Sequence, residues 1–175
     1  MRHLRPAGVV VAAALAAACF LAFDLAEALI SAFGCAVLVA VSVTDLERRI
    51  IPNRIVLPAT ALVLVAQTIR DPSVEWVLAA LAAGGALFVA ALVYPAGMGM
   101  GDVKLAAFLG ALLGWDVIVA FFVAMVASLV PALVILARHG RAGRKMGIPF
   151  APFLALGGVV ALFAGGALLD WYLGL

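Results

Sequence analysis

The feature that most constrains this chain is a succession of apolar runs, most of them about as long as a bilayer is thick, with only short polar breaks between them. A transmembrane helix needs about 20 consecutive apolar residues, with a range of about 17 to 25. The runs cover residues 7–23, 28–44, 55–69, 76–96, 103–115, 117–137 and 153–169. We therefore predict an all-α, polytopic transmembrane helix bundle with about seven spans, of which residues 103–115 form the shortest.

The composition excludes a water-soluble domain. Of the 175 residues, 68% are hydrophobic and 11% are charged, whereas soluble domains are about half apolar and about a quarter charged. Such a chain has too few polar side chains to cover a surface in water. We interpret residues 1–175 as a single integral membrane domain. The first run follows basic residues as a signal peptide would, but the rest of the chain is equally apolar, so we interpret it as an uncleaved span.

The charged residues predict an orientation. Cytoplasmic segments of membrane proteins carry an excess of Lys and Arg. With a cytoplasmic N-terminus, ten of the eleven basic residues fall on the cytoplasmic side and only Arg70 falls outside. The ten are Arg2, Arg5, Arg48, Arg49, Arg54, Lys104, Arg138, Arg141, Arg144 and Lys145. We therefore expect the N-terminus inside and the C-terminus outside.

Two acidic residues on the predicted cytoplasmic side lie at the ends of apolar runs. Asp45 ends one run, and Asp102 follows a glycine-rich segment and opens another. An ionisable residue at a membrane boundary is costly unless it is hydrated or paired, so it is a candidate functional group. Two structural alternatives stay open here. Asp102 could cap the N-terminus of a helix, and Asp45 could be a solvated acid that pairs with Arg48 or Arg49.

A pair of carboxyl groups is sufficient for acid–base hydrolysis, in which one takes a proton from water and the other protonates the substrate. The negative end of a helix dipole would disfavour ionised Asp45, and the positive end of another would favour ionised Asp102. This difference predicts that Asp45 holds the shared proton and that Asp102 activates the water. The chemistry needs no metal or other cofactor, and Cys19 and Cys35 do not have a metal-binding spacing.

Three ordered motifs resemble those of the type IV prepilin peptidases. Residues 99–102 read G-M-G-D, residues 45–53 read D-L-E-R-R-I-I-P-N, and residues 148–157 read I-P-F-A-P-F-L-A-L-G. The resemblance implies a polytopic aspartyl protease whose catalytic residues match Asp45 and Asp102. It also implies supporting or substrate-binding roles for the other matching positions, which are Pro52, Asn53, Gly99, Gly101, Lys104, Pro149 and Pro152.

The resemblance also implies the substrate and the location. Members of this family remove the short basic leader from prepilins and pseudopilins at the cytoplasmic face of the bacterial inner membrane. We therefore expect a prepilin or pseudopilin partner, contact with membrane lipids and no nucleic acid. Many members also methylate the new N-terminus and carry an insertion with paired C-x-x-C zinc motifs. Only 44 residues precede Asp45 and no C-x-x-C pair is present, so we expect the short form, with peptidase activity alone.

Two other classes of function compete with the peptidase. A small proton-coupled transporter would use the acids as a proton relay, but it would place them deeper inside the spans than they lie here. A non-catalytic assembly protein of a pilus or secretion machine would keep the fold, but it would have no need of both Asp45 and Asp102.

Overall fold

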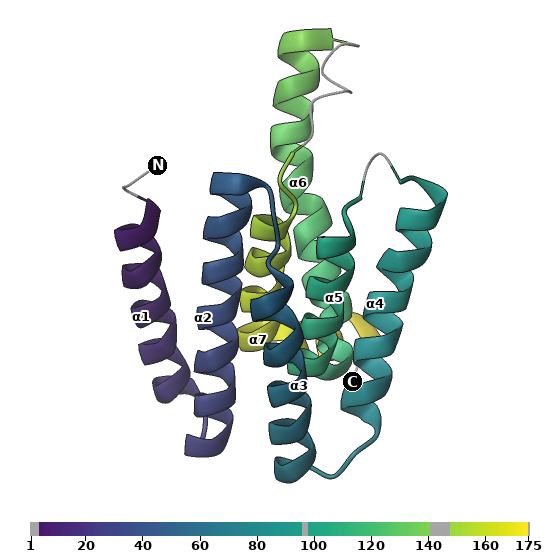
Figure 1. Cartoon of the computed structure of the whole chain (residues 1–175). Helices are drawn as coiled ribbons and strands as arrows, with labels where there is room; N and C mark the ends of the chain where they lie inside the picture. The colour runs from purple at the N-terminus through teal and green to yellow at the C-terminus, as the bar shows by residue number, and fades with distance from the viewer. Residues whose placement is uncertain (1–3, 96–97, 141–147, 175) are drawn as a thin grey trace.

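The computed structural model describes residues 4–95, 98–140 and 148–174, and these residues fold as an all-α bundle (Figure 1). The expected fold class is therefore confirmed. The helices are α1 (Leu4–Ala22), α2 (Leu25–Arg48), α3 (Asn53–Arg70), α4 (Glu75–Val93), α5 (Met100–Leu113), the short 3₁₀ helix η1 (Gly114–Asp116), α6 (Val117–His139) and α7 (Ala151–Leu173).

The expected number of about seven spans is wrong by the measure of length and apolarity. Four stretches of the described chain are long and apolar enough to cross a membrane, namely Leu25–Arg48, Glu75–Val93, Met100–His139 and Ala151–Tyr172, and α1 adds a shorter apolar stretch. The number is lower partly because α5, η1 and α6 follow one another without a break and count as one stretch of 40 residues. It is lower also because Asn53, Arg54 and Arg70 make both ends of α3 polar.

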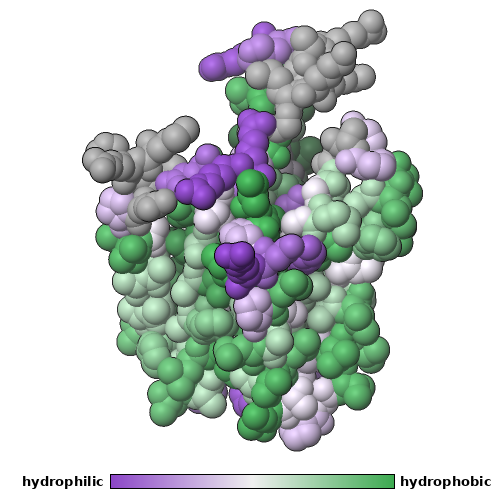
Figure 2. All heavy atoms as spheres, viewed as in Figure 1, coloured by the Kyte–Doolittle hydropathy of each residue, from purple (hydrophilic) through white to green (hydrophobic). Residues whose placement is uncertain are grey.

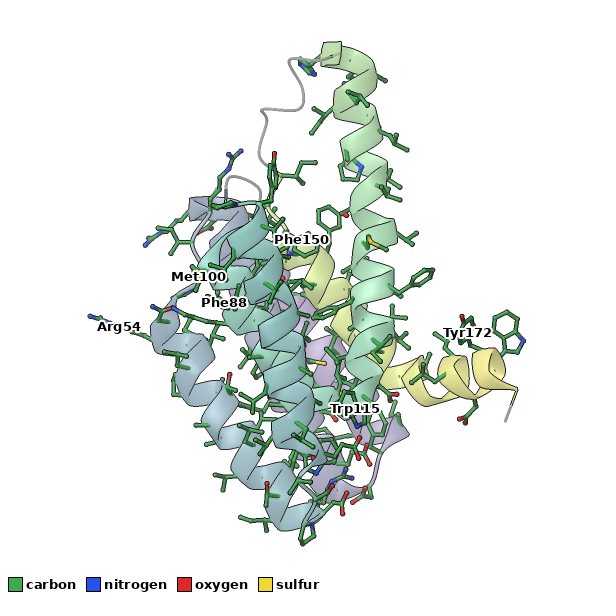
Figure 3. All side chains as sticks on the ribbon, turned by 90° about the vertical axis from the view of Figure 1, so that its right-hand side faces the viewer. Arg54, Phe88, Met100, Trp115, Phe150 and Tyr172 are labelled. Atoms are coloured by element: carbon green, nitrogen blue, oxygen red, sulfur yellow. The ribbon has the colours of Figure 1, made fainter. Side chains whose placement is uncertain are left out.

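Successive helices run in opposite directions, so the connections gather at two ends of the bundle (Figure 1). We call the end with the C-terminus of α2 and the N-termini of α3 and α5 the upper end, as it is drawn. At the opposite, lower end, α3 leads into α4. Met100 and Phe150 lie toward the upper end and Trp115 nearer the lower end (Figure 3).

The helix α5 forms the centre of the bundle. Nearly all of its residues from Val103 to Leu113 are buried, including the fully buried Phe108. A helix that is apolar on all sides is typical of such a central position. Its neighbours approach closely because small residues line the contacts, as is usual in membranes. A side chain at Gly110 would collide with the backbone carbonyl of Ala79 in α4.

The outer surface separates a hydrophobic region from a polar one. Large apolar side chains such as Leu21, Ile69 and Val93 are exposed on the outside of the bundle, which suits contact with lipid. Figure 2 shows hydrophilic residues gathered in the upper half of the viewed face, over a mainly hydrophobic lower half. Two helices leave the compact part: α6 rises beyond its neighbours (Figure 1), and the end of α7 with Tyr172 points away (Figure 3).

Candidate active site

Asp45 lies in the last turn of α2. The polar break in the sequence predicts that the helix ends before Asp45, but α2 continues for about one turn beyond that point. The helix continues through Arg48 and ends at Arg49, whose backbone is left-handed with φ 53°. The N–H of Arg49 donates a hydrogen bond of 2.8 Å to the backbone carbonyl of Asp45. Asp45 is only 7% exposed. Asp45 is therefore not a solvated loop acid, although its carboxyl group does interact electrostatically with Arg49, as that alternative expected.

The carboxyl group of Asp45 faces the start of α7. The backbone N–H of Ala151, the first residue of α7, is directed at this carboxyl group. Its Oδ2 atom is buried and has no hydrogen-bond partner among the described residues. Buried polar atoms are nearly always hydrogen-bonded, and a catalytic role is one of the recognised reasons for an exception. The N-terminus of a helix favours a negative charge placed there.

Asp102 is the third residue of α5. The helix begins at Met100, with Gly99 as its N-cap residue. The N–H of Gly99 donates a hydrogen bond of 3.3 Å to Oδ2 of Asp102, and the N–H of Asp102 donates one of 3.0 Å to the carbonyl of Gly99. Asp102 therefore does cap this helix, but from inside the first turn and with one carboxyl oxygen, so capping and catalysis are compatible.

The structure brings the three motifs together at the upper end. The carboxyl group of Asp102 interacts electrostatically with that of Asp45. Nζ of Lys104 donates a hydrogen bond of 2.8 Å to Oδ1 of Asn53. Because Ala151 faces Asp45, the third motif also contributes to this site.

The proline positions shape the backbone near the site. Pro52 is the N-cap residue of α3, and its carbonyl accepts hydrogen bonds from the N–H groups of Ile55 and Val56. Pro152 is the second residue of α7, where a helix does not use the N–H that proline lacks. Pro149 is half-buried in the segment that leads into α7. All three prolines therefore lie at or just before the start of a helix.

Two participants were not singled out from the sequence. Ile51 packs so closely against Gly101 that a Cβ at position 101 would lie 2.8 Å from Cβ of Ile51. Ala151 contributes a backbone group, which no side-chain pattern indicates. Both residues lie inside the motifs. Their position in those motifs is the only feature of the sequence that could have indicated them. Gly97, in the glycine-rich segment before Asp102, lies outside the described residues.

Comparisons with known proteins point to one family. Residues 32–136 match the type IV leader peptidase family. A Bacillus subtilis protein named prepilin leader peptidase/N-methyltransferase is 34% identical over 174 residues, which cover 96% of this chain and 69% of that protein. Proteins of the same name from Legionella pneumophila and Burkholderia pseudomallei are 30% and 36% identical over 79% and 87% of this chain. The chain spans about half the length of these two relatives, 50% and 52%. No solved structure was found to match.

Proposed function

The chain belongs to the type IV leader peptidase family, and from that membership we propose that it is an aspartic endopeptidase that removes the basic leader from prepilins or pseudopilins. The observation that supports Asp45 and Asp102 as its catalytic pair is that their carboxyl groups interact electrostatically at the upper end, although 56 residues separate them along the chain. Each is held by a helix terminus, Asp45 at the end of α2 and Asp102 at the start of α5.

The proposed reaction is hydrolysis of a peptide bond by two carboxyl groups that share one proton. The ionised member of the pair takes a proton from a water molecule, and the resulting hydroxide attacks the scissile carbonyl carbon. The protonated member then gives its proton to the nitrogen of the leaving amine as the C–N bond breaks. The pair ends with one proton, as it began, so no covalent intermediate and no cofactor are required.

The position of α7 does not support the predicted division of roles between the two aspartates. Helix dipoles were expected to favour ionised Asp102 over ionised Asp45. The start of α7, however, is directed at Asp45, and this N-terminus favours a charge there as the start of α5 does at Asp102. The dipoles therefore do not separate the two residues, and we propose that the pair titrates as one unit.

We further propose that the upper end faces the cytoplasm and that the basic leader is removed on that side of the membrane. Arg48, Arg49, Arg54 and Lys104 all belong to the upper end. At the lower end Arg70 pairs with Glu27, with 3.0 Å between Nη1 and Oε2. This distribution agrees with the excess of basic residues on cytoplasmic segments. A substrate with a basic leader and an apolar helix would then lie with their junction near the aspartates.

The names of the relatives also record an N-methyltransferase, and we do not extend that activity to this chain. The expectation of a peptidase alone rests on the sequence, which has two cysteines and no C-x-x-C pair. Both cysteines are buried, and neither forms a disulfide. Co-expression with a prepilin would report methylation separately, because it changes the mass of the product but not the site of cleavage.

The test of the peptidase is cleavage of a tagged prepilin in membranes that contain wild type, Asp45→Ala or Asp102→Ala. Wild type should release the leader. Each variant should cleave at least about 100-fold more slowly, because a general acid or base usually contributes a factor of that size to the rate. Asp71→Ala, an exposed acid at the lower end, is the matched control and should cleave normally. Undiminished cleavage by Asp45→Ala or Asp102→Ala, at normal protein levels, would exclude the pair.

A further inference from the structure

We propose that the connection between α2 and α3 holds the two aspartates in register, through two contacts with the first turns of α5. One contact is Ile51 against Gly101, and the other is Asn53 with Lys104. We call these four residues the α2–α3 clamp. They are positioning residues rather than catalytic ones, and their effect on cleavage rests on the proposed function of Asp45 and Asp102.

A clamp is needed because the helices that carry the aspartates touch each other little. The helix α2 packs mainly against α1, α7 and α3, and α5 packs mainly against α4 and α3. The direct contact between α2 and α5 is slight by comparison. The position of Asp102 relative to Asp45 therefore depends on the two helices that contact both α2 and α5, which are α3 and α7, and on the connection that leads into α3.

The first contact fixes the start of α5. A Cβ at position 101 would lie 2.8 Å from Cβ of Ile51, which is closer than Cβ atoms pack in proteins, and 3.1 Å from Cδ1 of Ile51. Ile51 is half-buried and rests against the hydrophobic core. Because Gly101 immediately precedes Asp102, any side chain here would shift the backbone that carries the catalytic carboxyl group.

The second contact lies on the other side of Asp102 along the chain. Nζ of Lys104 donates its hydrogen bond of 2.8 Å to Oδ1 of Asn53, the first residue of α3. One contact alone would let the start of α5 pivot about Ile51. Two contacts, at positions 101 and 104, fix both its distance and its rotation.

The expected consequence is a change in kcat with little change in KM. Catalytic groups must sit within hydrogen-bond reach of the reacting atoms, and a misplacement of about 1 Å can cost about 100-fold in rate. Substrate binding would persist because the clamp residues act on the position of Asp102 and not on the substrate itself. If Lys104 instead bound the substrate directly, its loss would raise KM with kcat unchanged.

The kinetic test compares Lys104→Met and Asn53→Leu, singly and together, with purified full-length protein in proteoliposomes and a purified prepilin. Each single variant should lower kcat about tenfold, and the double variant should be no worse than either one, because both remove the same bond. Asn53→Asp keeps an acceptor for Lys104 and should retain activity. Arg54→Met, an exposed basic neighbour, is the control and should match wild type. Additive losses, or a change confined to KM, would overturn the clamp.

The close contact has its own pair of variants. Gly101→Ala should lower kcat strongly because the added methyl group collides with Ile51. Adding Ile51→Gly removes the colliding atoms and should restore part of the loss. Normal levels of membrane-inserted protein for both variants would show that folding is not the cause. A double variant as inactive as Gly101→Ala alone, at equal protein levels, would speak against this contact as a determinant of position.

A readout without cleavage separates the clamp from the proposed function. In a Cys19→Ala/Cys35→Ala background, Asp45→Cys and Asp102→Cys are joined with bifunctional thiol reagents of increasing length. Lys104→Met and Asn53→Leu should lower the yield with the shortest effective reagent, and Arg54→Met should not. An unchanged yield would overturn the clamp even if wild type cleaves prepilin. A lowered yield in a protein that cleaves no prepilin would overturn the proposed function and leave the clamp standing.

Discussion

Arg49 shows how a single residue holds the backbone beside Asp45. Among the described residues it is the one non-glycine residue with a positive φ, 53°. An L-residue in this left-handed conformation costs about 1 to 2 kcal/mol, and glycine adopts it freely. The same residue donates the hydrogen bond that ends α2 at the carbonyl of Asp45. The free-energy cost of the left-handed backbone therefore lies close to the candidate catalytic residue Asp45.

Replacing Arg49 should separate the backbone cost from the role of the side chain. Arg49→Gly and Arg49→Ala remove the same charge, but only glycine relieves the left-handed conformation. We expect the free energy of unfolding of Arg49→Gly to be about 1 kcal/mol higher than that of Arg49→Ala. Denaturant titration in detergent micelles measures this difference. Equal stability of the two variants would contradict the left-handed end of α2.

At the scale of elements, glycines determine how closely the helices pack. A side chain at Gly157 of α7 would collide with the backbone carbonyl of Ala120 in α6. The helices can therefore approach until their backbones touch, as small residues allow in membranes. The position of α7 matters for the site because its first residue, Ala151, faces Asp45.

Two glycines of α7 provide a matched pair of substitutions. Gly157→Ala should force α6 and α7 apart and lower the free energy of unfolding by about 1 to 3 kcal/mol, the usual cost of overpacking. Gly166→Ala meets no atom within 4 Å and should be neutral or stabilise by up to about 1 kcal/mol, because alanine favours helix. The midpoint temperature of thermal unfolding and the rate of prepilin cleavage should both fall for Gly157→Ala and should not fall for Gly166→Ala. A Gly166→Ala variant as unstable as Gly157→Ala would contradict the close contact.

At the scale of the whole molecule, the two ends of the bundle differ in how their polar groups are used. At the lower end, Arg70 pairs with Glu27 of α2, and Nε2 of Gln67 donates a buried hydrogen bond of 3.0 Å to the carbonyl of Leu112 in α5. These bonds join α3 to both neighbours. At the upper end lie the two aspartates, and Oδ2 of Asp45 has no partner among the described residues. Polar groups thus join helices at both ends, through Arg70 and Gln67 below and through Lys104 and Asn53 above, but the buried carboxyl oxygen without a partner lies at the upper end.

The orientation can be tested with single cysteines at the two ends. Arg54 at the upper end and Val74 at the lower end are both exposed, and the native Cys19 and Cys35 are fully buried. In a Cys19→Ala/Cys35→Ala background, a membrane-impermeant maleimide should label Val74→Cys in intact cells. It should label Arg54→Cys only after the membrane is opened. Labelling of Arg54→Cys in intact cells would reverse the proposed orientation.

The sequence by itself determined the solvent, the class of fold and the residues worth testing. Apolar runs and the three motifs are local patterns, so they are readable along the chain, and they led to the all-α bundle and to Asp45 and Asp102. Local patterns also misplaced features that depend on neighbours. The sequence places Asp45 at the start of a polar break, yet α2 continues to Arg48 and Asp45 is buried.

Only the tertiary structure decided which residues meet. The contacts of Ile51 with Gly101, of Asn53 with Lys104 and of Ala151 with Asp45 join segments about 50 or more residues apart. The physical reason is that lipid and protein core are both apolar. A membrane helix such as α5 is apolar on every side, so its sequence does not show which face turns inward, and packing alone places the aspartates.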